Sequence, residues 1–191
     1  MTKEKILLLL SGILFLANLF AWDIVYGFAG PKYLEVNFFN VGQGDSAFIQ
    51  TPRKQQILID GGPNSSVIKK LSQEMPFYDH TIDLIILSHP DKDHLAGLLE
   101  VLKKYQVKNI LWTGIKRDTN EWQEWNRLIN HSGANIKIAR AGERILLDSG
   151  IFIDILSPQE NLEGKEFKDS NDTSVVAELR NNTKSFLFVG D

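Results

Sequence analysis

Side chains that can bind metal ions are concentrated in one short stretch of the sequence, at His89, Asp91, Asp93 and His94. Because residues two apart in an extended loop point to the same side, His89 and Asp91 can face one metal ion together. Asp93 and His94 are adjacent and diverge, so they can serve a second ion nearby. Two divalent ions about 3.5–4 Å apart can activate water and stabilise both the attacking and the leaving oxygen. The spacing therefore predicts a metal-dependent hydrolase, with Asp93 as the candidate catalytic residue.

The available donor atoms restrict which metal can bind. The chain contains no cysteine, so disulfides, thiolate nucleophiles and Cys-based zinc sites are excluded. Imidazole nitrogen combined with carboxylate oxygen suits Zn²⁺, and a carboxylate-rich set also accommodates Mn²⁺. We therefore expect two divalent metal ions, with zinc favoured over manganese. Asp93 alone would also serve as an N-cap for a helix that opens at Leu95.

The elements around this loop follow from the spacing of apolar residues. Runs rich in β-branched and aromatic residues predict strands at 33–40, 46–51, 56–59, 83–87, 107–112, 136–139, 144–147, 151–156, 174–179 and 185–189. Helical spacing predicts helices at 65–75, 95–105 and 121–131. Hairpins combined with helices between strands indicate a mixed α/β (α+β) layered domain. The metal-binding loop would then follow a buried strand and precede a helix.

The composition indicates a packed globular core and no general affinity for polyanions. Hydrophobic residues make up 43% of the chain and charged residues 24%, which excludes a disordered protein. The net charge is −3, whereas phosphate affinity is mainly cationic. Any contact with nucleic acid would therefore need a local basic patch.

An apolar segment without charges occupies residues 6–22 and predicts a membrane anchor extending over 6–28. Lys3 and Lys5 precede it, which weakly favours a cytoplasmic N-terminus and a domain on the extracytoplasmic side. A cleaved signal peptide followed by secretion is the first alternative, and a buried core helix is the second. Gly30-Pro31 marks a turn or a linker. We therefore expect an N-terminal segment, 1–30, and a domain, 31–191.

The loop and its surroundings resemble a known family. The run SHPDKDHLAGL is similar to the His-x-Asp-x-Asp-His variant of the metallo-β-lactamase signature. That variant is typical of the C-terminal domain of ComEC-type DNA-uptake proteins and their stand-alone relatives. The runs NFFNVGQGDSAFIQ, QILIDGG and SNDTSVVAELRNNTKSFLFVGD resemble the family's opening strand and turn, its next strand and its later hairpin. The resemblance spans residues 34–191 and implies a four-layer αββα sandwich.

The resemblance also implies roles for individual residues. His89 and Asp91 would bind one metal ion, and Asp93 and His94 the second. Asp191 would be the carboxylate that bridges the two ions. Asp60 would orient a metal-bound imidazole from behind the ligands, a role that carboxylates commonly play beside metal-bound histidines.

Further residues have weaker assignments. Asn171 or Asp172 lies where other metallo-β-lactamase-fold enzymes place another His ligand. Asp45 belongs to a glycine-rich turn near the site and either shapes that turn or faces the substrate. Members of the family continue beyond the residue equivalent to Asp191 with another sheet, a helix and a final His ligand. The sandwich is therefore expected to be incomplete at the C-terminus, and this fragment is expected to show little or no activity.

Three function classes are consistent with the sequence. The resemblance implies a phosphodiesterase or nuclease-like hydrolase linked to DNA uptake, with DNA as its substrate. The same site can instead hydrolyse a lactone, a thioester or a small phosphoester, because one fold hosts many chemistries. The third class is a non-catalytic metal-binding module of an envelope or DNA-uptake complex. A metal assay separates the third class from the others, and a panel of substrates separates the first two.

Overall fold

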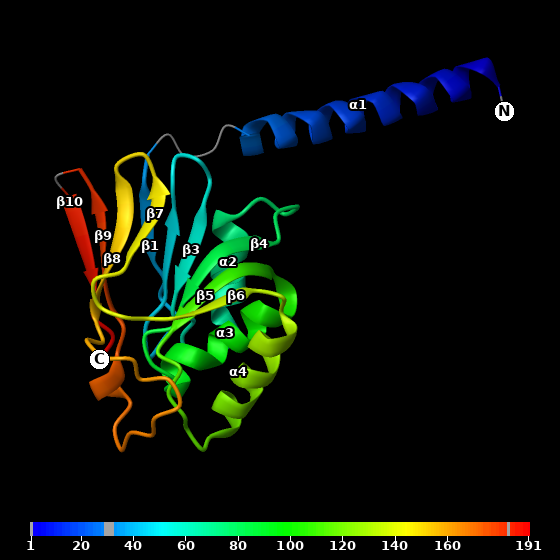
Figure 1. Cartoon of the computed structure of the whole chain (residues 1–191). Coiled ribbons are helices and arrows are strands. Elements are labelled where there is room, and N and C mark those ends of the chain that lie inside the picture. The colour runs from blue at the N-terminus through cyan, green and yellow to red at the C-terminus, as the bar shows by residue number, and fades with distance from the viewer. Residues whose placement is uncertain (1, 29–32, 183) are drawn as a thin grey trace.

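A long apolar helix precedes a layered α/β domain in the computed structural model, which describes residues 2–28, 33–182 and 184–191 (Figure 1). The helix, α1 (Lys3–Phe28), extends away from the domain. Its segment Lys3–Val25 has a mean hydropathy of 2.0, is not buried against the domain along its most apolar stretch, and is long and apolar enough to cross a membrane. The predicted Gly30-Pro31 linker, and with it the boundary between the two predicted segments, lies outside the described residues.

The first sheet has six strands in sequence order. Strands β1 to β3 pair antiparallel, and β3 to β6 pair parallel. Parallel neighbours end at the same edge of a sheet, so the loops that follow β3, β4 and β5 gather there. The strands are β1 (Glu35–Phe38), β2 (Ala47–Gln50), β3 (Gln56–Ile59), β4 (Thr81–Ile86), β5 (Gln106–Trp112) and β6 (Asn135–Ile138).

Three helices cover one face of this sheet (Figure 1). They are α2 (Ser66–Glu74), α3 (Lys92–Lys104) and α4 (Asn120–His131). Each places an apolar stripe against the strands, because residues three or four apart share a helix face. Leu71 of α2, Leu98 of α3 and Trp125 of α4 are fully buried in this core.

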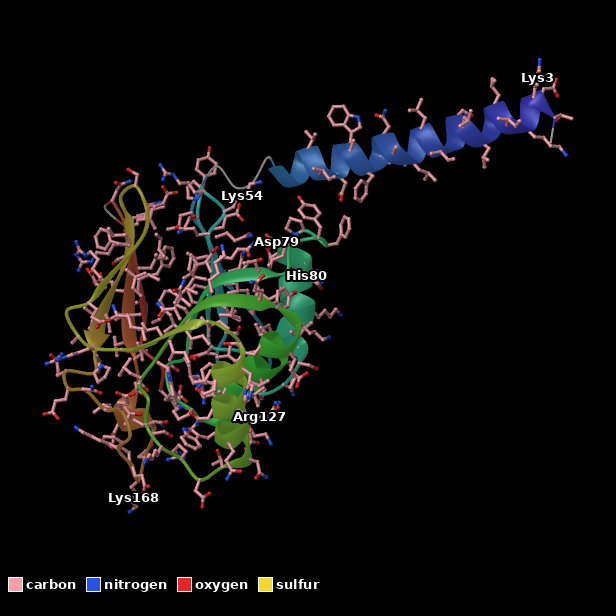
Figure 2. The ribbon with its side chains drawn as sticks, turned by 45° about the vertical axis from the view of Figure 1, so that its right-hand side comes forward. Lys3, Lys54, Asp79, His80, Arg127 and Lys168 are labelled. Carbon is pink, nitrogen blue, oxygen red and sulfur yellow. The ribbon has the colours of Figure 1, made fainter. Side chains whose placement is uncertain are left out.

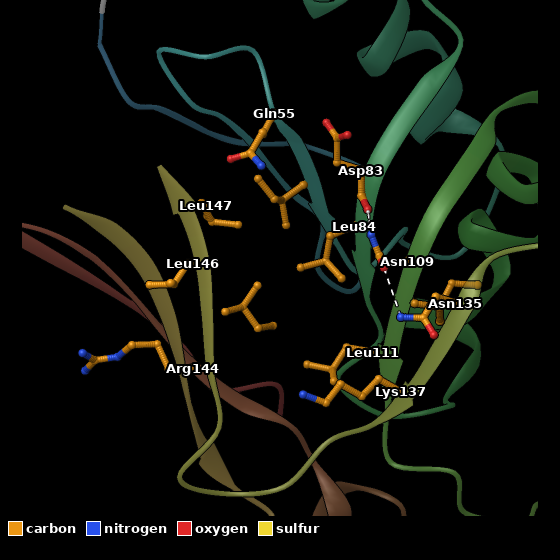
Figure 3. A pocket seen from close by; sticks show the side chains of 13 residues that line it. Gln55, Asp83, Leu84, Asn109, Leu111, Asn135, Lys137, Arg144, Leu146 and Leu147 are labelled. Atoms are coloured by element: carbon orange, nitrogen blue, oxygen red, sulfur yellow. Dashed lines mark hydrogen bonds between the residues drawn. The ribbon is translucent and has the colours of Figure 1, made fainter. Parts of the chain in front are cut away.

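The second sheet packs against the other face of the first. Its strands are β7 (Arg144–Asp148), β8 (Ile151–Ser157), β9 (Val176–Asn181) and β10 (Lys184–Phe188), in the order β10-β9-β8-β7. Ile153 and Ile155 of β8 point inward and join Ile57 and Ile86 of the first sheet in a second core. At one side the sheets leave a cavity of about 280 Å³, lined by strand residues of both sheets such as Leu84 and Leu147 (Figure 3).

The predicted mixed α/β fold, with one apolar N-terminal helix, is therefore confirmed, as a stack of helices, sheet and sheet. Within the described ranges, no α-helix covers the outer face of the second sheet. That face carries ion pairs instead, among them Arg144 with Asp154. Helix α3 begins at Lys92, earlier than predicted, so Asp91 occupies the N-cap position and Asp93 lies in the first turn. The alternative interpretation of Asp93 as an N-cap is thus wrong.

Candidate metal centre

The candidate site forms where strands β3 and β4 end side by side. Ile59 pairs with Ile86, so Asp60 and Ser88 follow at the same edge. The backbone of Asp60 has φ 56°, a left-handed conformation that Asp tolerates better than most residues. Its carboxylate accepts a hydrogen bond from the Ser88 backbone N–H at 2.8 Å and from the Ser88 hydroxyl at 2.6 Å. These contacts hold the Asp60 carboxylate at the sheet edge.

The carboxylate of Asp60 also lies 2.9 Å from Nδ1 of His94. Helix α3 approaches closely here, because Gly61 N–H donates to the His94 carbonyl and Gly97 N–H to the Gly62 carbonyl, at 2.8 and 2.9 Å. A Cβ atom on Gly97 would collide with the backbone of Gly61. The glycines thus let α3 bring His94 to Asp60. This is the contact that the predicted orienting role of Asp60 requires.

His89 is held in a similar way. Its Nδ1 lies 3.0 Å from the hydroxyl of Ser88 and 3.5 Å from that of Ser174. Its Nε2 is buried and has no hydrogen-bond partner within the described part of the chain. Buried polar atoms are nearly always paired. A buried imidazole nitrogen without a protein partner is the donor that a metal ion would use.

Two histidines and one carboxylate converge at this place. His89, His94 and Asp191 each offer a donor atom, and these atoms lie within 4.8 Å of one another. The two imidazole centroids are 4.1 Å apart, and Nε2 of His94 is 3.4 Å from Oδ2 of Asp191. Imidazole with carboxylate is a normal ligand set for Zn²⁺ and for related divalent ions. The residues therefore fit the metal that the sequence predicts.

Asp191 reaches the site from the second sheet. It follows β10 through Gly190, whose φ of +65° favours glycine. A Cβ atom on Gly190 would lie 2.9 Å from the Ser174 hydroxyl oxygen and 3.3 Å from Cβ of Ser88. The chain therefore passes closely over the two serines that hold His89. The Asp191 side chain remains 53% exposed.

Asp91 lies beside this group, and its two oxygens have different neighbours. Oδ2 is 4.0 Å from Nε2 of His89. Oδ1 accepts a short hydrogen bond from the Ser170 hydroxyl and lies 3.5 Å from the Arg117 guanidinium. One oxygen is thus held by the protein while the other faces an imidazole. Sequence reasoning missed Ser170 and Arg117, which lie 79 and 26 residues from Asp91 in the chain.

Asp93 lies in the first turn of α3, against the glycine-rich turn. A Cβ atom on Gly44, at φ +81°, would collide with Asp93, so a glycine is needed there. Burial lowers the pKa of His94, and among the groups that raise it the charge of Asp93 has a smaller effect than Asp60 and Asp191. The three-residue group with converging donors does not include Asp93. Its catalytic role, and the division of the loop residues between two ions, stay predictions.

Asp45 lies near the centre. It is exposed and lines a cavity of about 170 Å³ together with Asp60, Ser88 and Gly190. The larger cavity in Figure 3 contains no residue of the site. The smaller cavity lies nearer to the site, because Asp60 and Ser88, which line it, contact His94 and His89, although no donor residue lines the cavity itself.

Asn171 and Asp172 begin a short 3-10 helix next to Ser170. Oδ1 of Asn171 is buried without a hydrogen-bond partner in the described structure, whereas Asp172 is exposed. Of the two, Asn171 carries the buried oxygen without a hydrogen-bond partner in the described part of the chain. Its predicted position as a further ligand stays a prediction.

The two histidines differ electrostatically. Burial, followed by the neighbouring His94, lowers the pKa of His89. Burial also lowers the pKa of His94, but the hydrogen bond and charge of Asp60, with Asp191 and Asp93, outweigh it and raise this pKa to about 9. Without metal, His89 is therefore neutral near pH 7 and His94 is protonated. A metal ion that binds His94 must displace that proton.

Residues 39–191 match the family model of the metallo-beta-lactamase superfamily. The chain belongs to this superfamily. It is 25% identical over 175 residues to ComE operon protein 3 from Bacillus subtilis (strain 168), an alignment that covers 82% of this chain and 22% of that protein. The predicted relationship to ComEC-type proteins is confirmed.

Solved structures agree on the fold. A metallo-beta-lactamase with the HARLDQ motif from Cronobacter sakazakii matches with a TM-score of 0.51 and 15% identity, covering 88% of this chain and 62% of that one. The metallo-beta-lactamase fold protein YhfI from Bacillus subtilis matches with a TM-score of 0.50 and 16% identity, covering 83% and 60%. The chain thus spans about a fifth of the curated relative and less than two thirds of these structures.

Proposed function

We propose that this metallo-beta-lactamase superfamily hydrolase cleaves phosphodiester bonds of nucleic acid. The observation that carries the hydrolase chemistry is the convergence of His89, His94 and Asp191, with Asp91 beside them. When bound there, divalent metal ions supply Lewis acidity and a water of lowered pKa. The number and identity of the ions, with two expected and zinc favoured over manganese, belong to the proposal.

The chain's own residues position the donors. Asp60 and Ser88 hold both imidazoles through Nδ1, so Nε2 of each ring is directed to another partner. The buried imidazoles exclude water from behind the site, since His89 and His94 are at most 1% exposed. Asp191 closes the site from the more exposed side. Such fixed polar groups need little reorganisation during a reaction.

Arg117 supports an anionic substrate. Its guanidinium is partly buried at the edge of the centre, 3.5 Å from Asp91. A planar guanidinium pairs well with the oxygens of a phosphate. Because the net charge is −3, contact with nucleic acid must come from such local cations. The relationship to ComEC-type proteins supports a role linked to DNA uptake or to an envelope complex.

A panel of substrates tests the proposal. The full-length gene product in lipid nanodiscs would be loaded with Mn²⁺ or Zn²⁺ and given bis-p-nitrophenyl phosphate, single-stranded DNA, a lactone and a thioester. We expect metal-dependent turnover of the two phosphodiesters, lost in His94→Ala and retained in the exposed control His131→Ala. Turnover of only the lactone or the thioester would overturn the substrate class. Stoichiometric metal binding without any turnover would instead indicate a non-catalytic module.

We also propose that α1 anchors the chain in a membrane, with the domain on the extracytoplasmic side. Support comes from the length and hydropathy of Lys3–Val25 and from Lys3 and Lys5 before the apolar run. The full chain should resist carbonate extraction, and external protease should digest the domain in spheroplasts. Release at an undiminished mass would refute the anchor, and a shortened, released chain would indicate a cleaved signal peptide.

A further inference from the structure

An aromatic turn projects from the end of the domain that lies nearest to α1. This turn, Pro76–Asp79, connects α2 to β4 and is closed by a hydrogen bond from the Asp79 N–H to the Pro76 carbonyl at 2.9 Å. Its central residues, Phe77 and Tyr78, are 64% and 43% exposed. Their rings meet edge to face, with centroids 5.4 Å apart. A pair of adjacent exposed rings forms an apolar patch, which scattered single residues do not.

The aromatic turn is firmly held at both ends. Asp79 accepts a hydrogen bond from the Gln56 side-chain amide at 2.8 Å and from the Thr81 N–H at 3.0 Å. Met75, just before the turn, is buried in the core with 5% exposure. Phe77 and Tyr78 are therefore presented by a fixed piece of backbone. Their exposure does not arise from a frayed chain end.

The aromatic turn contacts α1 near the end of its uncharged run. The rings of Phe77 and Phe20 lie 6.1 Å apart. Phe20 closely precedes Trp22 and Asp23, where the apolar run ends. With α1 across a bilayer, Phe20 lies in the last part of the span, within one helical turn of Asp23, and Phe77 is at the same depth. Aromatic side chains favour this interfacial layer.

The position of the aromatic turn relative to the metal centre follows from Figure 2 and from the course of β4. Figure 2 shows Asp79, His80 and Lys54 at the end nearest α1, and Lys168 at the opposite end. Strand β4 starts at Thr81, separated from the aromatic turn by one residue, and ends at Ile86. Six extended residues span about 20 Å. The aromatic turn and the metal centre therefore lie at opposite ends of the same strand.

We propose that the aromatic turn is a second membrane contact, in which Phe77 and Tyr78 insert into the interfacial layer of the bilayer that holds α1. This rests on the proposed anchoring by α1. Two points of attachment fix the orientation of the domain relative to the bilayer, which a single point of attachment does not. The metal centre at the other end of β4 then opens away from the bilayer, toward substrates in solution.

Because the chain contains no cysteine, a single introduced cysteine carries a label at one defined position. The full chain would be reconstituted in vesicles of equal parts phosphatidylcholine and phosphatidylglycerol. An environment-sensitive fluorophore would be attached to Phe77→Cys or to Tyr78→Cys, each of which keeps the other aromatic ring. Leu146→Cys is the matched control, because Leu146 is 75% exposed on the second sheet. Leu14→Cys, within α1, reports on the anchor itself.

The measurement is quenching of the fluorophore by iodide in the external water. We expect labels at 77 and 78 to be quenched several-fold less than the label at 146, and the label at 14 to be protected. If the label at position 14 is protected while the labels at 77 and 78 are quenched as strongly as the label at 146, the second contact is refuted and the anchor stands. If the label at 14 is also quenched as strongly as 146, anchoring fails and the second contact fails with it.

Discussion

The two sides of the candidate metal centre differ in how they are held. On the side of the six-stranded sheet, His89, His94 and Asp60 are at most 2% exposed and are linked by hydrogen bonds. On the exposed side, Asp191 follows β10 and Asp91 caps α3, and their side chains are 53% and 34% exposed. The fold itself therefore holds the buried side chains in place, whether or not a metal ion is bound. Changes there should alter stability and metal affinity together, whereas changes on the exposed side should alter metal affinity alone.

The largest effect is expected from His94→Ala. It leaves the buried carboxylate of Asp60 without its cationic partner, and removing one member of a buried ion pair typically costs about 3–5 kcal/mol. Denaturant unfolding of the metal-free chain should show a loss of this size, and calorimetric titration with Zn²⁺ should show no tight binding. His131→Ala, on the exposed end of α4, should change neither. Unchanged stability of His94→Ala would mean that the buried side is not held by this pair.

The pH dependence of the metal-free chain sharpens the same point. The pKa of His94 is raised to about 9, above its ordinary value of about 6.5. Its protonation therefore stabilises the fold fully below pH 6.5, and this contribution disappears as the pH rises through 9. In chelator, we expect the free energy of unfolding to fall by roughly 3 kcal/mol over that range.

His94→Gln provides the control for the pH dependence. It removes the titrating group and should flatten the profile between pH 6.5 and 9. An equally steep decline in His94→Gln would assign the pH dependence to other groups.

On the exposed side, Asp191→Ala should separate metal affinity from stability. The Asp191 side chain is 53% exposed, and substitutions of exposed side chains usually change stability by less than about 0.5 kcal/mol. Calorimetric titration of the metal-free protein with Zn²⁺ should show weaker binding. Denaturant unfolding of the same metal-free preparation should show an unchanged midpoint. Asp118→Ala, at another exposed carboxylate, should leave both unchanged. A large loss of stability in Asp191→Ala would erase the difference between the two sides.

The smallest effect is expected from Arg117→Ala. Arg117 lies beside Asp91 at the mouth of the centre, so its loss should raise KM for a phosphodiester on the order of tenfold, the loss of one charge-assisted hydrogen bond. KM for an uncharged ester should hardly change. Arg127→Ala, on the surface of α4, is the matched control. An equal rise in KM for both substrates would show that Arg117 positions Asp91 rather than the substrate.

The sequence predicted the elements well because their signals are local. The runs that became β3 and α4 carry their own periodicity, and residues 56–59 form a strand at the expected positions. The metal-binding loop was found for the same reason, since His89 and His94 lie close together in the chain.

The contacts that hold the site could not be predicted in this way. Ser170 and Arg117 meet Asp91 only through the folding of distant loops, and a lone serine or arginine has no signal in the sequence. Ser88 is the first residue of the run SHPDKDHLAGL, but its contacts with Asp60 and His89 depend on the parallel pairing of β3 with β4. Gly97 lies inside the predicted helix 95–105 and has no signal of its own there, yet its lack of a side chain lets α3 approach Gly61.

The central claim is that the buried imidazoles are metal ligands, and X-ray absorption at the zinc edge of the loaded full chain tests it most directly. We predict a shell of nitrogen and oxygen at about 2.0–2.2 Å, with outer-shell scattering from two imidazole rings that disappears in a variant combining His89→Ala with His94→Ala. No sulfur should appear, because the chain has no cysteine. A shell of oxygen alone, or imidazole scattering that persists in the double variant, would contradict the assignment.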